Sequence, residues 1–407
     1  MSSRRPALAF ILVTLALDVL GIGVIIPILP KLVEQFEGGS VAEASGSYGL
    51  LSASYSLMQF GFAPLLGCLS DRFGRRPVIL ASLFGAGVDY FLMAWAPSLG
   101  WFFVARIISG VTGANFAAAA AYIADISPPE KRAAHFGLIG AAFGLGFILG
   151  PALGGFLGGY GLRVPFVVAG VITLLNWLYG WWVLPESLPP ELRRRVSWDR
   201  ANPVGALLRL GRYPRVLNLA AVHFLIQLAH QSLPSTWVLY TGYRYGWSVR
   251  QTGISLAIVG LMAAVVQGGL TRFLIPRLGE GRAVLMGLVV SAGSFAGYGL
   301  ATEGWMIYAI LIVGSLGGIT NPAVQSWVSR SVGADEQGGV QGSLTSLASL
   351  AGVAGPPLMT WIFGVFVSDG TSLRLPGAAF FCSGLLVSWA AVMAWGILRR
   401  NQVEGVP

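Results

Sequence analysis

The chain has 407 residues, of which 55% are hydrophobic and only 11% are charged. Soluble domains carry about 25% charged residues, so this composition excludes an ordinary soluble protein and indicates one built for lipid. The formal net charge of +9 does not indicate nucleic-acid binding, because the basic residues fall between apolar segments and form no basic domain.

Twelve apolar segments follow one another, each near the length of about 20 residues that a helix needs to cross a bilayer. We expect spans near residues 8–30, 48–69, 78–96, 101–123, 135–159, 164–184, 216–241, 251–275, 283–301, 304–329, 338–366 and 376–398. The Pro- and Arg-rich stretch after the sixth span predicts a solvated connector that faces lipid headgroups. The sequence therefore predicts an all-α membrane protein of two six-helix halves: an N-terminal bundle (1–184), a cytoplasmic connector (185–214) and a C-terminal bundle (215–407).

Two further features of the apolar segments concern processing and redox chemistry. The first apolar run, within residues 1–30, is too long for a cleavable signal peptide and has no small-residue cleavage site after it. Cys68 and Cys382 lie in or beside spans, far apart in the sequence, and predict buried thiols and no disulfide.

The basic residues are distributed unevenly between the two ends of the predicted spans. Twenty of the 26 Lys and Arg residues fall on one side, five fall on the other, and Arg106 lies within a span. Cytoplasmic loops carry the excess of Lys and Arg in membrane proteins. We therefore expect both termini in the cytoplasm.

The two halves of the chain resemble each other in sequence. Gly137 recurs as Gly342, and the pair Gly150–Pro151 recurs as Gly355–Pro356, both at an offset of 205 residues. A duplicated six-helix unit is typical of transporters, with the substrate site near the midplane between the halves. The sequence shows no catalytic constellation and no metal-ligand spacing, so neither an enzyme nor a metal site is expected.

A charged, glycine-bracketed stretch, GCLSDRFGRRPV (Gly67–Val78), separates the second and third spans. Its charges exclude it from hydrocarbon, and we expect Gly67 and Gly74 to form a tight reversal. We interpret it as part of a cytoplasmic gate, in which Asp71 docks at a helix N-terminus and Arg75 or Arg76 reaches Asp125. The alternative is a loop that only sets topology.

Several motifs carry a resemblance to a known family. The stretch resembles the signature of the major facilitator superfamily between its second and third helices, which places the family residues at Gly67, Leu69, Asp71, Arg72, Gly74, Arg75 and Arg76. The fourth-helix motif is similar through Arg106, Gly110 and Ala114. The fifth-helix motif of drug:proton antiporters is similar through Gly146, Gly150, Pro151, Gly154 and Gly155. Four further stretches resemble the tetracycline–proton antiporter subfamily: Leu17–Pro30, Tyr48–Gly67, Val88–Leu99 and Ala121–Gly137.

This resemblance implies a function. It implies a secondary transporter in the bacterial inner membrane that exports a drug-like, amphipathic compound in exchange for protons. It also implies a protein that works as a monomer, with protons as the coupling ion and no other cofactor. Two alternatives stay open: an exporter of a metabolite, sugar or lipid on the same scaffold, and a membrane sensor that transports nothing.

Asp18 and Asp89 are the acidic residues that lie deep in the predicted spans. The charged form of a carboxyl group is disfavoured in hydrocarbon, which suits a group that holds a proton until a cationic substrate displaces it. Arg106 lies inside the fourth span and needs a partner, which Asp18 or Asp89 could supply. The resemblance assigns all three to proton coupling and export; structural aspartates and a static ion pair are the alternatives.

Other residues within the spans are candidates for packing or for binding. The fifth-helix glycines are typical of close helix contact, Pro151 predicts a kink, and the resemblance implies a role in limiting proton leak. The polar residues that could bind substrate, or bond only to another helix, are Gln59, Asn115, Gln227, Gln231, Gln267, Asn321 and Gln325. His230 could carry protons, because imidazole titrates near neutrality, or could bond to a neighbouring helix.

The second half departs from the tetracycline exporters at two positions. Those proteins have a histidine in the eighth helix and an aspartate in the ninth, and the corresponding residues here are Ala263 and Ser291. We therefore expect any carboxylate that couples protons to lie in the first half.

Overall fold

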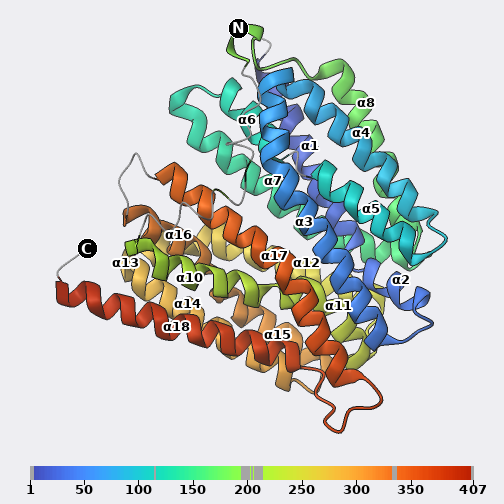
Figure 1. Cartoon of the computed structure of the whole chain (residues 1–407), viewed down its shortest axis with the longest axis vertical. Helices are drawn as coiled ribbons and strands as arrows, with labels where there is room; N and C mark the ends of the chain where they lie inside the picture. Colours follow the sequence, from blue (N-terminus) through green and yellow to red (C-terminus); the bar gives the residue numbers. More distant parts are fainter. Residues whose placement is uncertain are drawn as a thin grey trace. The chain divides into compact units, whose positions relative to one another are not determined.

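The computed structural model describes residues 4–113, 116–193, 202, 205, 214–331 and 337–404. These residues form helices joined by short turns, with no strand among them, and the helices cover all twelve predicted spans (Figure 1). Ten helical segments in this part of the chain are long and apolar enough to cross a membrane, and α5 (Leu99–Thr112) is a shorter apolar helix. The predicted all-α fold is confirmed.

The helices of the first half are α1 (Arg4–Ile25), α2 (Leu29–Phe36), α3 (Val41–Phe73), α4 (Arg75–Ala94), α5, α6 (Phe116–Ile126), α7 (Pro129–Gly158) and α8 (Val164–Val183). A short 3₁₀ turn, η2 (Pro190–Leu192), follows. The second half contains α10 (Pro214–His230), α11 (Ser232–Tyr245), α12 (Val249–Val265), η4 (Val266–Leu270), α13 (Thr271–Leu278), α14 (Glu280–Leu300), α15 (Gly304–Gly314), η5 (Ser315–Ile319), α16 (Thr320–Arg330), α17 (Gln337–Val367) and α18 (Ala378–Glu404).

Several of the predicted spans are broken helices. The first span turns at residues 26–28 between α1 and α2, where Pro27 and Pro30 each lack the N–H that a continuous helix needs. The eighth span passes through a π-helical turn, η4, and the tenth through a 3₁₀ turn, η5. Irregular turns of this kind within transmembrane helices are common at functional sites.

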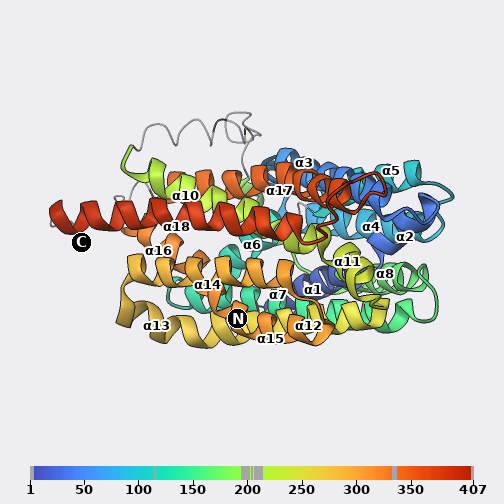
Figure 2. The same cartoon turned by 90° about the horizontal axis from the view of Figure 1, so that it is seen from below.

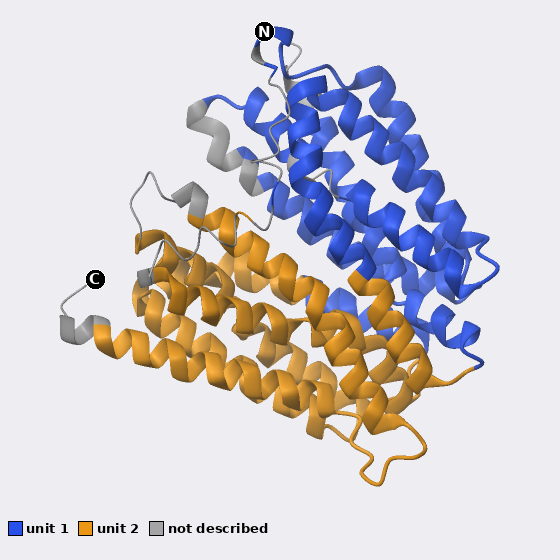
Figure 3. Ribbon diagram, in the orientation of Figure 1, with its two compact units in different colours: residues 1–38, 54–203, 248–260 blue, residues 39–53, 204–247, 261–407 orange. Residues whose placement is uncertain are grey.

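The chain divides into two compact units, each of which takes one segment from the other half of the sequence (Figure 3). Unit 1 comprises residues 1–38, 54–203 and 248–260, and unit 2 comprises residues 39–53, 204–247 and 261–407. The first part of α3 therefore belongs to unit 2, where Tyr48 donates a hydrogen bond to the Pro234 carbonyl at 3.2 Å. The first part of α12 belongs to unit 1.

Helix α7 is the centre of the close packing in unit 1. A Cβ atom on Gly150 would lie 2.7 Å from Cα of Gly23 on α1, and one on Gly146 would lie 2.7 Å from Cβ of Val19. On another face of α7, a Cβ on Gly155 would lie 3.0 Å from the Val249 carbonyl oxygen of α12. The fifth-helix glycines therefore act first as a packing device, because small residues let helix backbones approach closely.

In unit 2, helix α18 packs along both α10 and α14 and lies between them in Figure 2. Gly74 and Gly279, 205 residues apart, occupy the same position before α4 and α14, with φ of +105° and +78°. The positive φ explains glycine at both positions. The internal repeat predicted from the sequence is therefore visible in the backbone.

Candidate functional site

A charge cluster lies between α4 and α5 within unit 1. Asp89 has a side chain that is only 1% exposed, and the nearest guanidinium nitrogen of Arg106 lies 4.0 Å from its Oδ2. The hydroxyl of Ser109 joins the two groups, since it accepts a hydrogen bond from Arg106 at 2.8 Å and donates one to Asp89 Oδ2. Arg106 therefore interacts with Asp89, one of its two predicted partners, mainly through the Ser109 hydroxyl. Sequence reasoning missed Ser109, although its position one turn after Arg106 was a usable signal.

The Arg106 guanidinium also contacts Met93 and Tyr55. Arg106 donates to the Met93 sulfur at 2.9 Å and lies 5.5 Å from the centre of the Tyr55 ring. Gln59 donates to the Tyr55 hydroxyl at 2.8 Å, so this predicted polar residue belongs to the cluster. The predicted residues Ala114 and Asn115 lie outside the described part of the chain.

Two buried atoms of the cluster have no hydrogen-bond partner among the described residues: Asp89 Oδ1 and Arg106 Nε. A buried polar atom left unpaired costs about 1–3 kcal/mol, so such atoms are rare and need an explanation. Oδ1 can bind a proton without the loss of any existing hydrogen bond, because Ser109 contacts only Oδ2. The cluster therefore has the chemistry of a reversible proton site.

Asp18 lies on α1 close to the same cluster. It acts electrostatically on Tyr55 and Tyr90, and both tyrosines also interact with Asp89 and Arg106. Gly21, one turn after Asp18, faces the Tyr90 ring, where a Cβ on the glycine would lie 3.1 Å from Cζ. The structure thus brings the three predicted coupling residues into one electrostatic neighbourhood within unit 1.

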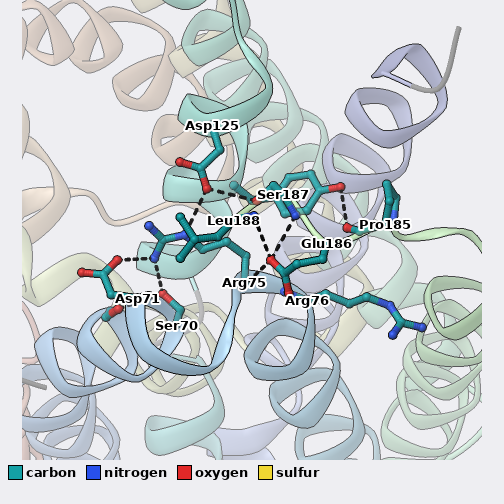
Figure 4. A network of polar contacts seen from close by, with 11 residues as sticks. Ser70, Asp71, Arg75, Arg76, Asp125, Pro185, Glu186, Ser187 and Leu188 are labelled. Atoms are coloured by element: carbon teal, nitrogen blue, oxygen red, sulfur yellow. Dashed lines mark hydrogen bonds and ion pairs between the residues drawn. The ribbon is translucent and has the colours of Figure 1, made fainter. Parts of the chain in front are cut away.

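A second polar network, which we call the α3–α4 network, surrounds Arg75 at the start of α4 (Figure 4). Arg75 pairs with Asp71 at 2.6 Å and with Asp125 of α6 at 3.2 Å, and it donates to the Ser70 hydroxyl at 2.6 Å. The predicted contact with Asp125 is therefore made by Arg75. Arg76 instead donates to the Trp181 carbonyl at 2.6 Å.

The turn between α3 and α4 corrects two expectations. Residues 67–73 are the last turns of α3, so Gly67 continues a helix, and Gly74 alone supplies the reversal. Arg72 lies against the ring of its neighbour Phe73, at 5.1 Å. The carboxylate at the N-terminus of α4 belongs to Glu186, a residue that sequence reasoning missed, while Asp71 pairs with Arg75.

The predicted polar residues of unit 2 lie on several elements and have different contacts. The Nδ1 of His230 bonds to the Ile226 carbonyl of its own helix at 2.8 Å, because an i–4 carbonyl is within reach, so this bond is not the interhelical one given as an alternative. Gln231 lies between α10 and α11 and packs against Gly355. The Oδ1 of Asn321 is buried without a hydrogen-bond partner in the described chain.

The remaining predicted polar residues have different environments. Gln227 is half-buried on α10, whereas Gln267 in η4 and Gln325 in α16 are exposed. Ala263 lies on α12 and Ser291 is buried on α14, and neither can carry a proton as an acid would. Within the described spans, the acidic residues Asp18 and Asp89 and the basic residue Arg106 therefore lie in unit 1.

Comparisons with known proteins identify the family. The Major Facilitator Superfamily profile matches residues 11–356. The chain is 42% identical to the class C tetracycline resistance protein of Escherichia coli, over 92% of this chain and 94% of that protein. It is 37% identical to the class B protein of Escherichia coli, over 95% of both. A crystal structure of a bacterial homologue of the lysosomal transporter Spinster superimposes with a TM-score of 0.77 over 98% of each chain, and its 17% identity supports the fold.

These findings define an integral, multi-pass inner-membrane transporter. The chain belongs to the Major Facilitator Superfamily. The predicted resemblance to the tetracycline-resistance group and the predicted function as a proton-coupled drug antiporter are both confirmed. Neither the alternative exporter nor the non-transporting sensor is favoured.

Proposed function

We propose that this protein exports a tetracycline-type compound, amphipathic and cationic or metal-chelating, and that Asp89 exchanges a proton for it. The observation that carries the proposal is the buried, unpartnered Oδ1 of Asp89 beside Arg106. The substrate class is supported by the names of the tetracycline-resistance relatives, each of which aligns over most of the chain.

The proton is held at Asp89 Oδ1. While it is bound, Asp89 is neutral and the Arg106 charge repels a cation. When it leaves, the carboxylate faces Arg106 through the Ser109 hydroxyl and the pair becomes neutral overall. A cationic substrate therefore meets less repulsion after proton release, and this difference in affinity between the two states couples drug binding to proton release. Asp18, beside the same tyrosines, is the second carboxyl group of this neighbourhood.

The same proposal covers the arrangement in the membrane. The protein works as a monomer, with both termini in the cytoplasm, and the α3–α4 network lies at the cytoplasmic face. The sequence bundles 1–184 and 215–407 rock about the substrate site during alternating access. The distribution of Lys and Arg supports this orientation.

Transport in proteoliposomes tests the proposal. With an acidic lumen as the only driving force, the wild type should accumulate tetracycline, and Asp89→Asn should not. Asp89→Asn should also bind the drug more weakly in detergent, because the neutral amide, like the protonated carboxyl group, leaves the Arg106 charge uncompensated. Membrane insertion should be unchanged, since the two side chains have nearly the same shape. Asp369→Asn is the matched control, because Asp369 is fully exposed and, within the described chain, pairs with Arg374 alone, at 3.1 Å.

Two results would contradict the proposal. If Asp89→Asn still concentrates drug on a pH gradient alone, the proton site lies elsewhere. If the wild type moves other compounds of a test panel but no tetracycline, the substrate class is wrong, and the Asp89 test is repeated with the compound that is moved.

A further inference from the structure

The N-terminus of α4 carries positive charge that no residue in the helix's own first turn compensates. The helix begins with Arg75 and Arg76, its first turn contains no acidic residue, and its N-cap, Gly74, has no side chain. The first N–H groups of a helix lack internal partners, and this end carries a partial positive charge. Two arginines add to that charge, so an isolated helix with this sequence would fray at its start.

Glu186, which follows α8 and lies 111 residues further along the chain than Arg75, supplies the missing acceptor (Figure 4). Its Oε1 accepts a hydrogen bond from the backbone N–H of Arg75 at 2.9 Å, and its Oε2 accepts one from Arg76 at 3.2 Å. Oε1 also accepts from the N–H groups of Ser187 and Leu188, each at 3.0 Å. One carboxylate thus joins two segments of backbone.

Two further hydrogen bonds connect residues 185–187, at the start of the connector, to α6. Ser187 donates its hydroxyl proton to Asp125 Oδ2 at 3.0 Å, on the oxygen that also pairs with Arg75. The Tyr122 hydroxyl donates to the Pro185 carbonyl at 3.0 Å. The start of the connector therefore touches both the backbone of Arg75 and the partner of its side chain.

The second half of the chain shows the alternative solution. Glu280 is the first residue of α14 and stands 205 residues after Arg75, so this helix has an acid in its own first turn. Arg330 stands 205 residues after Asp125 and pairs with Glu280 at 2.9 Å. The repeat thus contains the same ion pair with its charges exchanged, and the half with arginine at the helix start takes its acid from a distant segment.

We propose that Glu186 is a positioning residue for the transport cycle. By holding the first turn of α4 it keeps Arg75 between Asp71 and Asp125, and it connects the start of the central connector to this network. The inference rests on the proposed function and on the interpretation of the α3–α4 network as a cytoplasmic gate, which has to open and close during export.

The first experiment measures transport and binding. Glu186→Ala should lower kcat for drug transport driven by a pH gradient by about tenfold or more, because loss of even one hydrogen bond to a charged group is worth about that factor and this carboxylate accepts several. KM and the drug affinity in detergent should stay within about twofold, because Glu186 acts on the conformational step. Glu191→Ala is the control: Glu191 is an exposed acid five residues on, in η2, outside the α3–α4 network.

A second-site variant separates positioning from a general structural role. Pro77→Glu places an acid in the first turn of α4, as Glu280 does in α14, and Pro77 is exposed. In the Glu186→Ala background it should restore at least half of the lost turnover. The proposal is overturned if Glu186→Ala transports like the wild type, if it loses drug affinity in step with turnover, or if an active Pro77→Glu protein gives no recovery in the double variant.

Hydrogen–deuterium exchange gives a readout that does not depend on the substrate. The amides of Arg75 and Arg76 should exchange at least fivefold faster in Glu186→Ala than in the wild type or Glu191→Ala, because two of their hydrogen bonds are lost. Unchanged exchange overturns the inference whatever the drug is. A wild type that moves no tetracycline, with the expected exchange result, would instead refute the proposed substrate.

Discussion

Substitution of Gly150 by alanine tests whether the contact between α1 and α7 is as close as the structure indicates. A Cβ there would lie 2.7 Å from Cα of Gly23 and 2.8 Å from the Leu20 carbonyl oxygen, whereas ordinary contacts are 3.4–4 Å. Both neighbours are backbone atoms and cannot rotate away. The two helices must therefore separate by roughly 0.6–0.7 Å at this point.

The cost can be compared with a matched control on the same helix. A Cβ added to Gly144 would meet no atom within 4 Å, so Gly144→Ala gains helix propensity without a clash. Both variants gain up to about 1 kcal/mol from propensity, so their difference isolates the overpacking cost, about 1–3 kcal/mol. We expect Gly150→Ala to be less stable than Gly144→Ala by this amount.

The measurement is the free energy of unfolding of the purified protein in mixed micelles with increasing sodium dodecyl sulfate. Drug export by the same variants is the second readout, because α1 carries Asp18 and its displacement disturbs the charge cluster. Equal unfolding free energies for the two variants would refute the close contact between α1 and α7. Full export by a destabilised Gly150→Ala would show that the position of α1 is not critical for coupling.

Two further predictions concern the polar networks. Arg75→Gln should lower the export rate about tenfold or more, because a buried guanidinium that pairs with two carboxylates is lost. Arg72→Gln is the control and should change the rate less than twofold, because Arg72 is exposed. Equal effects of the two substitutions would contradict the α3–α4 network. Ser109→Ala should reduce drug accumulation per unit of pH gradient in proteoliposomes, because Arg106 and Asp89 lose the hydroxyl that joins them. Ser109→Thr keeps a hydroxyl and should retain normal accumulation. Normal accumulation by Ser109→Ala would refute the hydroxyl bridge between Arg106 and Asp89.

The class of the protein was accessible from the sequence for a physical reason. Hydrocarbon admits helices of a limited length and excludes charge, so hydropathy and the spacing of charges predict the helices almost directly. The same exclusion marks Asp89 and Arg106 as unusual. The glycine before α4 and the repeat at 205 residues were also predictable, because a positive φ and a duplicated unit both leave local patterns.

The partners of these groups depended on the tertiary structure. Arg106 had two possible acids in the sequence, and packing placed the Ser109 hydroxyl between it and Asp89. Gly67 was compatible with a turn or a helix, and α3 continues through it. Glu186 caps a helix that begins 111 residues earlier. A buried donor or acceptor is satisfied by whichever group the fold brings within about 3 Å, and that distance is unrelated to separation along the chain.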